Sequence, residues 1–473
     1  MSHFFLVSLV VLFFFCSLEK SIAIDVHHHL VHIKSLLPSS SCSTFAKGPK
    51  RKASLDVVHK HGPCSLLNNN NSKSRILPTH SNILDLDKER VNYIHSKLLL
   101  SSKNNKIDQK LASSANLTAK SGSLIGSANY FVTVGLGTPI RNLSLVFDTG
   151  SDLTWTQCQP CSLSCYNQQD DIFDPSMSTS YSNITCTSSD CTQIYAATGR
   201  DPRCARLTNA CIYKIQYADE SFSEGYISQE RLTITQTDAI DNFLFGCGQN
   251  NQGLFNGSAG LLGLGRHPIS FIEQTSQLYN KTFSYCLPST SSDTGYLTFG
   301  ATNDSDVKYT PFSNVSNNSS FYGLDIIGIS VGGTQLPISS STFFSGGAII
   351  DSGTVITRLP LTAYVNLRDS FQKGMTKYPI ASSFSILDTC YDFSGNEMIS
   401  IPKIRFFFRG GVAVELAALG ILYAESLGQV CLAFAANEDD SDITIFGNVQ
   451  QRTLKVVYDV GGGKIGFGSN GCK

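Results

Sequence analysis

The chain has 473 residues, 15% of them charged, and a formal net charge of −1 that hides a marked asymmetry. Residues 24–120, named the leader here, carry fifteen Lys and Arg against six acidic residues, a net charge of +9. Residues 121–473, the body, carry twenty basic and thirty acidic residues, a net of −10. We expect the basic leader to lie over the acidic body as a pro-segment. Nucleic-acid binding through the basic run Lys47–Lys52 is the weaker alternative, because such short runs are usually solvated.

The N-terminus predicts secretion. An apolar run, Phe4–Cys16, is followed by Ser21, Ile22 and Ala23, which is typical of a signal peptide spanning residues 1–23. The run is shorter than the ~20 residues that a membrane span needs, and no later stretch is long and apolar enough. We expect an extracellular protein, with the vacuole and the plastid left open, and a mature N-terminus between about Leu111 and Ser127 after the leader is removed by acid.

Cysteine and glycosylation signals agree with that compartment. Twelve of the fifteen cysteines lie in the body, an even number that predicts six disulfides. A zinc site on Cys158, Cys161 and Cys165 fits by spacing alone, and bridges are favoured over it. The acceptor pattern Asn-x-Ser/Thr, which predicts a glycoprotein, begins at Asn142, Asn183, Asn256, Asn280, Asn303, Asn314, Asn317 and Asn318.

Histidine is nearly absent from the body. Nine of the ten histidines precede Ser121, and His267 alone follows it, in a turn-like sequence. A Ser-His-Asp or Cys-His catalytic system needs a histidine base inside the mature domain, and a histidine-rich zinc site needs several. Carboxylates must therefore carry out any general acid–base chemistry in the body, without metal or cofactor.

Two similar stretches supply those carboxylates. Leu145–Asp152 reads LVFDTGSD and Ala348–Val355 reads AIIDSGTV, each an apolar run that leads to Asp and a glycine turn. A duplicated lobe would bring Asp148 and Asp351 face to face, where two carboxylates share one proton. Such a pair can activate a water with one oxygen and protonate a leaving amine with the other. The alternative is two unrelated strand-to-turn junctions.

The rest of the body is predicted to be mostly β-structure in two lobes, residues 121–315 and 316–473, because its length exceeds what one core supports. One helix is expected over Leu361–Met375. Strands are expected over Tyr130–Gly137, Leu143–Phe147, Ile212–Tyr217, Tyr226–Ile234, Asn242–Gly248, Tyr296–Gly300, Phe321–Gly333, Ile404–Phe408, Val430–Ala435 and Leu454–Tyr458.

Further motifs make the body resemble the pepsin-like aspartic endopeptidases, most of all the plant nepenthesin-like and chloroplast-nucleoid-protease-like branch. Each half carries an apolar-glycine motif, Gly260–Gly265 (GLLGLG) and Ile443–Gly447 (ITIFG). Trp155 follows the first Asp motif as in that branch, and Cys158–Cys211 is similar to its cysteine-rich insertion. The leader sequence HKHGPCS, His59–Ser65, is also similar.

The resemblance implies a bilobal all-β fold with a central cleft and few short helices, acting as a monomer on protein or peptide substrates. It implies that Asp148 and Asp351 activate the water. The supporting residues would be Thr149 and Ser352 as a cross-braced pair, Ser151 and Thr354 as outer hydrogen-bond partners, and Gly150 and Gly353 near the water.

The flap that covers the substrate in this family maps to Tyr217, with Trp155 and Asp219 beside it. Ala218 and Glu220 replace two glycines of the branch pattern. Since neither favours a positive φ, the flap tip is expected to be stiffer or turned differently.

The resemblance also implies six bridges: Cys158–Cys161, Cys165–Cys247, Cys186–Cys211, Cys191–Cys204, Cys286–Cys472 and Cys390–Cys431. A second class of function stays open, because some plant relatives on this fold are inhibitors of other enzymes that have lost catalytic residues. The intact Asp and Gly residues of both motifs favour an enzyme.

Overall fold

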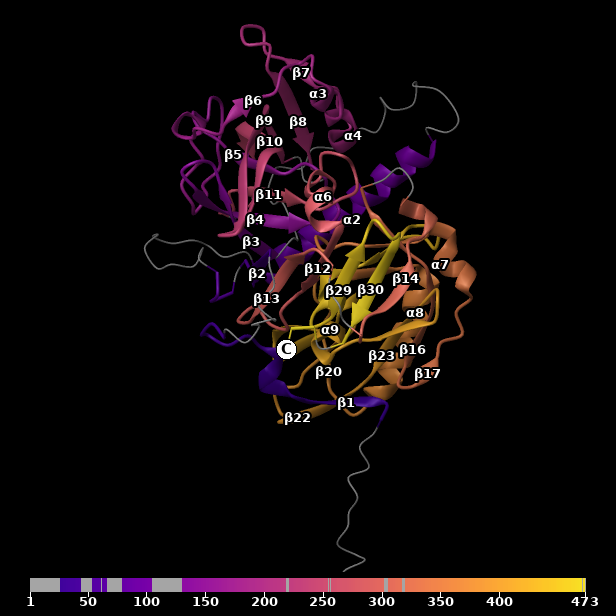
Figure 1. The fold of residues 1–473 in the computed structure, drawn as a ribbon. Coiled ribbons are helices and arrows are strands. Elements are labelled where there is room, and N and C mark those ends of the chain that lie inside the picture. Colours follow the sequence, from indigo (N-terminus) through magenta and orange to yellow (C-terminus); the bar gives the residue numbers. More distant parts are fainter. Residues whose placement is uncertain are drawn as a thin grey trace, which may run out of the picture.

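The computed structural model describes residues 26–43, 53–60, 62–65, 79–103, 130–217, 221–253, 255, 257–301, 305–316, 320–469 and 471–472. The expected signal peptide, the expected leader cleavage region, flap residues 218–220 and Asn256, Asn303, Asn317 and Asn318 lie outside these residues. Two β-rich lobes are joined by one long, continuous sheet (Figure 1). The all-β bilobal fold is thus confirmed.

The long sheet has fifteen strands and crosses from one lobe to the other. It contains β2 (Ser54–His59), β3 (Tyr130–Leu136), β4 (Arg141–Asp148), β5 (Trp155–Gln157), β6 (Ser182–Asn183), β7 (Arg203–Cys204), β8 (Cys211–Gln216), β9 (Phe222–Thr235), β10 (Asp238–Gln252), β11 (Gly260–Gly263), β12 (Thr282–Cys286), β13 (Thr294–Phe299), β14 (Lys308–Pro311), β29 (Lys455–Asp459) and β30 (Lys464–Gly468). The C-terminal strands β29 and β30 pair with β12 and β14, so the two halves of the chain share this sheet.

The second lobe adds three smaller sheets. One is built from β15 (Tyr322–Leu324), β18 (Ala348–Ile350), β28 (Thr444–Phe446), β19 (Thr357–Leu359) and β27 (Phe434–Ala436). Another holds β17 (Thr334–Gln335), β16 (Ile326–Val331), β23 (Ile404–Phe408) and β24 (Val412–Glu415). The third holds β20 (Ile380–Ala381), β21 (Cys390–Tyr391), β26 (Gln429–Leu432) and β25 (Leu422–Ser426).

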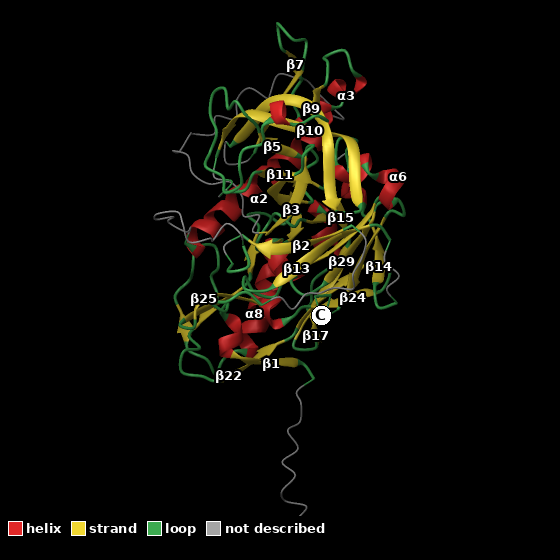
Figure 2. Cartoon of the chain, turned by 60° about the vertical axis from the view of Figure 1, so that its left-hand side comes forward, coloured by secondary structure: helices red, strands yellow, loops and turns green. Residues whose placement is uncertain are grey.

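Helices are few and mostly short (Figure 2). Those of the body are α3 (Ser189–Thr192), α4 (Ile194–Thr198), α5 (Phe271–Gln274), α6 (Ser276–Tyr279), α7 (Ser340–Gly346), α8 (Leu361–Gly374), α9 (Ala418–Ile421) and α10 (Asn448–Gln451), with 3-10 turns η3 (Pro175–Met177) and η4 (Asn314–Ser316). In α8 the buried side chains Ala363, Leu367 and Phe371 repeat at helical spacing. The helix expected over Leu361–Met375 is therefore confirmed.

The expected strands are present, with two refinements. The stretch expected as Phe321–Gly333 divides into β15 and β16, and Val430–Ala435 divides into β26 and β27. In each case the two pieces belong to different sheets. An apolar run gives the strand tendency but not the point at which the chain leaves one sheet for the next.

No elements were predicted in the leader, but its described residues form strands and a helix. Strand β1 (His28–His32) pairs antiparallel with β22 (Met398–Pro402) and is followed by the turn η1 (Ile33–Leu36). Strand β2 lies inside the long sheet between β13 and β3. Its alternation explains this position, because Leu55 and Val57 are buried whereas Asp56 between them is exposed.

Helix α2 (His80–Lys103) is the other leader element, and it lies between the two lobes in both views (Figures 1 and 2). Its start is a capping box: the Asn82 amide N–H donates to Thr79 Oγ1 at 3.2 Å, and the Thr79 N–H donates to Asn82 Oδ1 at 3.1 Å.

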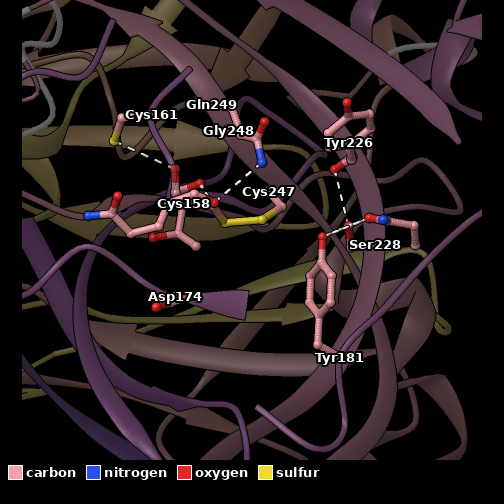
Figure 3. The surroundings of a disulfide bond; sticks show 12 residues. Cys158, Cys161, Asp174, Tyr181, Tyr226, Ser228, Cys247, Gly248 and Gln249 are labelled. Carbon is pink, nitrogen blue, oxygen red and sulfur yellow. Dashed lines mark hydrogen bonds between the residues drawn. A yellow bond between two sulfur atoms is a disulfide. The ribbon is translucent and has the colours of Figure 1, made fainter. Parts of the chain in front are cut away.

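Four of the six expected disulfides are wrong. In place of Cys158–Cys161 and Cys165–Cys247, the structure has Cys158–Cys247 and Cys161–Cys165. Figure 3 shows the first of these. In place of Cys186–Cys211 and Cys191–Cys204, it has Cys186–Cys204 and Cys191–Cys211. Strand pairing explains the first correction: β5 runs parallel to β10 with Thr156 opposite Cys247, so Cys158 comes close to Cys247.

The remaining pairs are Cys286–Cys472 and Cys390–Cys431, as expected. A further bridge within the leader, Cys42–Cys64, was not predicted. It closes the chain on both sides of β2 and so restricts the unfolded form of this segment.

Candidate active site

The two predicted aspartates stand at equivalent strand ends in the two lobes. Strand β4 ends at Asp148, and β11 runs parallel to it with Gly263 opposite Asp148. Asp351 directly follows β18, and β28 runs parallel to β18 with Phe446 opposite Ile350. The apolar-glycine motifs thus lie beside the strands that carry the aspartates.

Thr149 and Ser352 join these two strand ends. The Thr149 amide N–H donates to Ser352 Oγ at 3.2 Å, and the Ser352 N–H donates to Thr149 Oγ1 at 3.0 Å. Both side chains are buried. This reciprocal pair fixes the two loops relative to each other, in the arrangement expected of a cross-braced pair.

Each aspartate is also held by its own turn. The Gly150 N–H donates to Asp148 Oδ1 at 3.0 Å, and the Gly353 N–H donates to Asp351 Oδ1 at 3.2 Å. Thr354 Oγ1 donates to Asp351 Oδ2 at 2.6 Å, as expected of an outer partner.

Ser151, the corresponding outer residue of the first motif, differs from expectation. Its hydroxyl is buried without a hydrogen-bond partner in the described part of the chain. The symmetry of the two motifs therefore does not extend to the outer hydroxyls. In this state Asp148 Oδ1 accepts hydrogen bonds from Gly150 and from a leader residue.

That leader residue is Arg90 of α2, which bridges both aspartates. Its Nη2 lies 2.7 Å from Asp148 Oδ1 and 2.9 Å from Asp351 Oδ1, and its Nε lies 2.8 Å from Asp351 Oδ2. Charge-assisted bonds of this bidentate kind are among the strongest that a side chain makes. The guanidinium therefore occupies the position between the carboxylates.

Glycine is required at position 353 for this contact. A Cβ atom there would lie 2.2 Å from Arg90 Nη2, far inside van der Waals contact. The turn that supports Asp351 is thus open on the side from which the guanidinium approaches.

Arg90 changes the ionisation of the site. Burial opposes ionisation of Asp351, but the charge and hydrogen bonds of Arg90 outweigh it, so the pKa of Asp351 lies below its usual value. Burial likewise opposes the charge of Arg90, and the two carboxylates outweigh it and raise the Arg90 pKa. Both partners are therefore ionised when α2 is in place.

The rest of α2 docks by apolar and polar contacts. Ile83 and Leu84 join a buried cluster with Val355, the last residue of the second Asp motif, and Ile356. Asp87 is fully buried and pairs with Arg358 of β19, Asp87 Oδ2 and Arg358 Nη2 being 3.0 Å apart.

The helix continues across the second lobe. Val91 and Ile94 join a cluster that includes Ile349 of β18, two residues before Asp351. His95 Nε2 lies 3.1 Å from the carbonyl oxygen of Ile443.

The predicted flap residue Tyr217 follows β8 and meets Trp155. The indole Nε1 of Trp155 donates to the Tyr217 hydroxyl at 2.6 Å, and both rings pack against Phe255. Burial raises the pKa of Tyr217 well above its usual value, so it stays protonated. The Tyr217 N–H donates to the Ser221 carbonyl at 2.9 Å, which closes the hairpin between β8 and β9. Asp219 lies outside the described residues.

Several site residues were not predicted. Gln451 and Asn448 of α10 donate to the backbone carbonyls of Asp351 and Ser352 at 3.2 and 3.0 Å. Arg90 and Asp87 were missed because no helix was predicted in the leader. The apolar spacing of Ile83, Leu84, Val91 and Ile94 behind a Thr-x-x-Asn cap was the available signal.

The described residues lack two kinds of feature. They contain no helix both long and apolar enough to cross a membrane. Within the same residues, no group of three or more His, Cys, Asp and Glu side chains is arranged to hold a metal ion.

Two β-rich lobes with an aspartate at an equivalent strand end in each define a pepsin-like aspartic protease fold. Family models described as "Xylanase inhibitor N-terminal" and "Xylanase inhibitor C-terminal" match residues 130–301 and 321–469. An aspartyl protease family protein of Arabidopsis thaliana is 55% identical over 451 residues, 95% of this chain and 94% of that protein. The chain belongs to the pepsin-like aspartyl protease family of plants and is an enzyme of the aspartic protease type.

Two further relatives and one solved structure are also similar to this chain. Aspartyl protease AED1 of Arabidopsis thaliana is 50% identical, covering 94% of this chain and 92% of that one. Aspartic proteinase nepenthesin-1 of Nepenthes gracilis is 37% identical, covering 73% and 79%. The crystal structure of basic 7S globulin from soybean aligns with a TM-score of 0.58 at 19% identity, covering 72% of this chain and 92% of that one, which shows the shared fold alone.

Proposed function

We propose that this chain is the latent form of a secreted acid endopeptidase whose Asp148 and Asp351 activate a water for peptide hydrolysis. The single observation that carries the proposal is the Arg90 guanidinium, which bridges both carboxylates from the leader helix. The glycines and Thr354 that support the two carboxylates are all in place.

Catalysis requires that Arg90 leave. The two carboxylates then share one proton, because neighbouring carboxylates cannot both ionise without a compensating cation. The ionised member takes a proton from water as the water oxygen bonds to the carbonyl carbon, and the protonated member gives its proton to the carbonyl oxygen. The C–N bond then breaks as the carboxyl group that took the water proton gives it to the leaving nitrogen, and the other carboxylate takes a proton from the diol as the product carboxylic acid forms.

Latency has two causes in this account. Arg90 fills the place of the water and the reacting carbonyl group. It also lowers the pKa of Asp351, so the proton that the dyad needs as its acid is lost. The dyad needs one protonated carboxyl group as its acid, and beside the guanidinium Asp351 does not serve as that group.

The wider organisation follows from this role. Residues 1–23 act as a signal peptide, the leader (24–120) as the inhibitory segment, and residues 121–315 and 316–473 as the two lobes. The leader is cut between about Leu111 and Ser127. The mature enzyme is a glycosylated extracellular monomer that cleaves proteins or peptides.

The proposal is tested with the full chain at neutral pH and after acidification. We expect no cleavage of a test peptide before acidification and pepstatin-sensitive, chelator-insensitive cleavage after it. Asp351→Asn abolishes turnover and leaves the fold unchanged by circular dichroism. Full activity in Asp351→Asn, or activity lost with a chelator, contradicts the proposal.

A second candidate is a binding protein that inhibits a carbohydrate-cleaving enzyme, which the descriptions of the matching family models favour. The Asp148→Asn variant distinguishes the two functions. Protease activity is lost in this variant, whereas inhibition of a xylanase by surface contacts survives it.

A further inference from the structure

Arg358 is a buried cation whose anionic partner comes from the leader. It lies in β19 of the second lobe and is 3% exposed. Its Nη1 donates to the carbonyl oxygen of Ile356 at 3.2 Å, which orients the guanidinium, and its Nη2 pairs with Asp87 of α2. A buried charge without a partner is strongly destabilising. When α2 has left, water or an anion other than Asp87 must therefore contact the Arg358 guanidinium.

Two backbone donors and one cation of the body converge on the Asp87 carboxylate. The Val355 N–H donates to Asp87 Oδ1 at 2.6 Å, and the Ile356 N–H donates to Oδ2 at 3.1 Å. Arg358 Nη2 lies 3.0 Å from the same Oδ2. Two backbone N–H groups and a guanidinium arranged around two oxygens form a built carboxylate site.

This site lies beside the catalytic carboxylates. Asp87 and Arg90 are three residues apart on α2, so they lie on one face of the helix about one turn apart. Arg90 contacts both aspartates. Val355 directly follows Thr354, whose hydroxyl binds Asp351. When α2 leaves, these two N–H groups and the Arg358 guanidinium border the space in which a substrate must bind.

We propose that Arg358, with the N–H groups of Val355 and Ile356, forms a substrate subsite for the carboxylate of an Asp or Glu side chain near the scissile bond. This inference rests on the proposed endopeptidase function. Asp87 then acts as the occupant of that subsite in the latent form. The adjoining cluster of Val355 and Ile356, now covered by Ile83 and Leu84, offers an apolar wall to neighbouring substrate residues.

The test uses the acid-activated full chain and a peptide series that is identical except for one Glu or Gln, moved through each position around the scissile bond. At one position, kcat/KM should be about tenfold or more higher for Glu at a pH above about 5. The ratio should fall towards one at about pH 3, where the Glu side chain is protonated. A further peptide that ends at this position with a free carboxylate is compared with its amide. Preference for the free C-terminus without preference for Glu overturns the side-chain assignment.

Variants of Arg358 test whether this residue causes the preference for Glu over Gln. Arg358→Gln removes the Glu-over-Gln preference, and Arg358→Lys keeps part of it, because the charge remains but the planar guanidinium that the Ile356 carbonyl orients is lost. Arg368→Gln, which alters a partly exposed helix arginine paired with Asp369, is the matched control and keeps the full ratio. If the Arg358 variants do not fold, the pH dependence of the wild-type ratio decides alone.

The two proposals fail in different ways. Cleavage with no Glu preference at any position overturns the subsite and leaves the endopeptidase standing. If no peptide of the series is cleaved, both the endopeptidase and the subsite are overturned.

Discussion

Strand β2 and helix α2 belong to the same leader, yet the body holds them by different kinds of contact. β2 is paired through its backbone on both sides, to β13 and to β3, and buries Leu55 and Val57. α2 has no such ladder. It is held by side chains, above all by Arg90, Asp87 and His95, which meet charged or buried polar groups.

This difference separates two roles within one segment. Backbone pairing and apolar burial do not depend on pH, whereas ion pairs and buried histidines do. The structure therefore combines a strand that completes a sheet with a helix that blocks the catalytic site and responds to acid. The predictions below change one of these two regions and leave the other intact.

The largest effect is expected for Arg90→Ala in the full chain. Removing one partner of a buried ion pair costs about 3–5 kcal/mol, which is roughly a hundredfold to several thousandfold in the docking equilibrium of α2. The unprocessed variant should cleave a test peptide under conditions in which the wild-type chain is latent. Lys88→Ala, at an exposed position of the same helix, is the control and should remain latent. An Arg90→Ala chain as latent as wild type contradicts the account of α2.

For Val57→Ala in β2 we expect a loss of stability without a loss of latency. Val57 is fully buried, and loss of its two methyl groups should lower the free energy of unfolding by about 2 kcal/mol. Latency should not change. Chemical denaturation at neutral pH measures the first effect, and the peptide assay measures the second. Val58→Ala, one residue on at a partly buried position, should cost less. A loss of latency in Val57→Ala would show that β2 and α2 are not separate.

His95 is expected to have a smaller effect, on the pH at which α2 leaves the body. Burial lowers its pKa below 6.5, although the Ile443 carbonyl and the charges of Asp442 and Glu438 favour the protonated form and Arg358 opposes it. A histidine with a depressed docked pKa stabilises docking above about pH 6.5, and this contribution is lost as the pH falls through the docked pKa. Asp351, whose pKa is also lowered, adds a second loss at more acid pH. Asp87 acts in the opposite direction, because burial outweighs its partners and raises its pKa.

His95→Gln should therefore shift the midpoint of acid activation downward by about half a pH unit. The measurement is the rate of peptide cleavage after brief exposure of the chain to a series of pH values. His32→Gln, at an exposed position at the end of β1, is the control for loss of a leader histidine. An unchanged midpoint in His95→Gln removes this residue from the acid response.

The sequence predicts the dyad and most body strands because their signals are local. An apolar run that leads to Asp and Gly specifies a buried strand with a carboxylate at its end, in both halves. The pairing of Cys158 with Cys247 is not local, since it depends on β5 lying parallel to β10. The role of Arg90 is less accessible still. Its helix is predictable from spacing, but the contact with both aspartates follows only from the docked position of that helix.

Hydrogen–deuterium exchange tests the contrast between α2 and β2 most directly. The experiment uses the full chain with Asp148→Asn, which prevents self-cleavage and keeps the two Arg90 contacts to Asp351. After correction for intrinsic rates, peptides covering α2 should lose protection on acidification, while peptides covering β2 stay protected. Loss of protection in both regions together, or an α2 that stays protected at the pH of activation, would contradict the account.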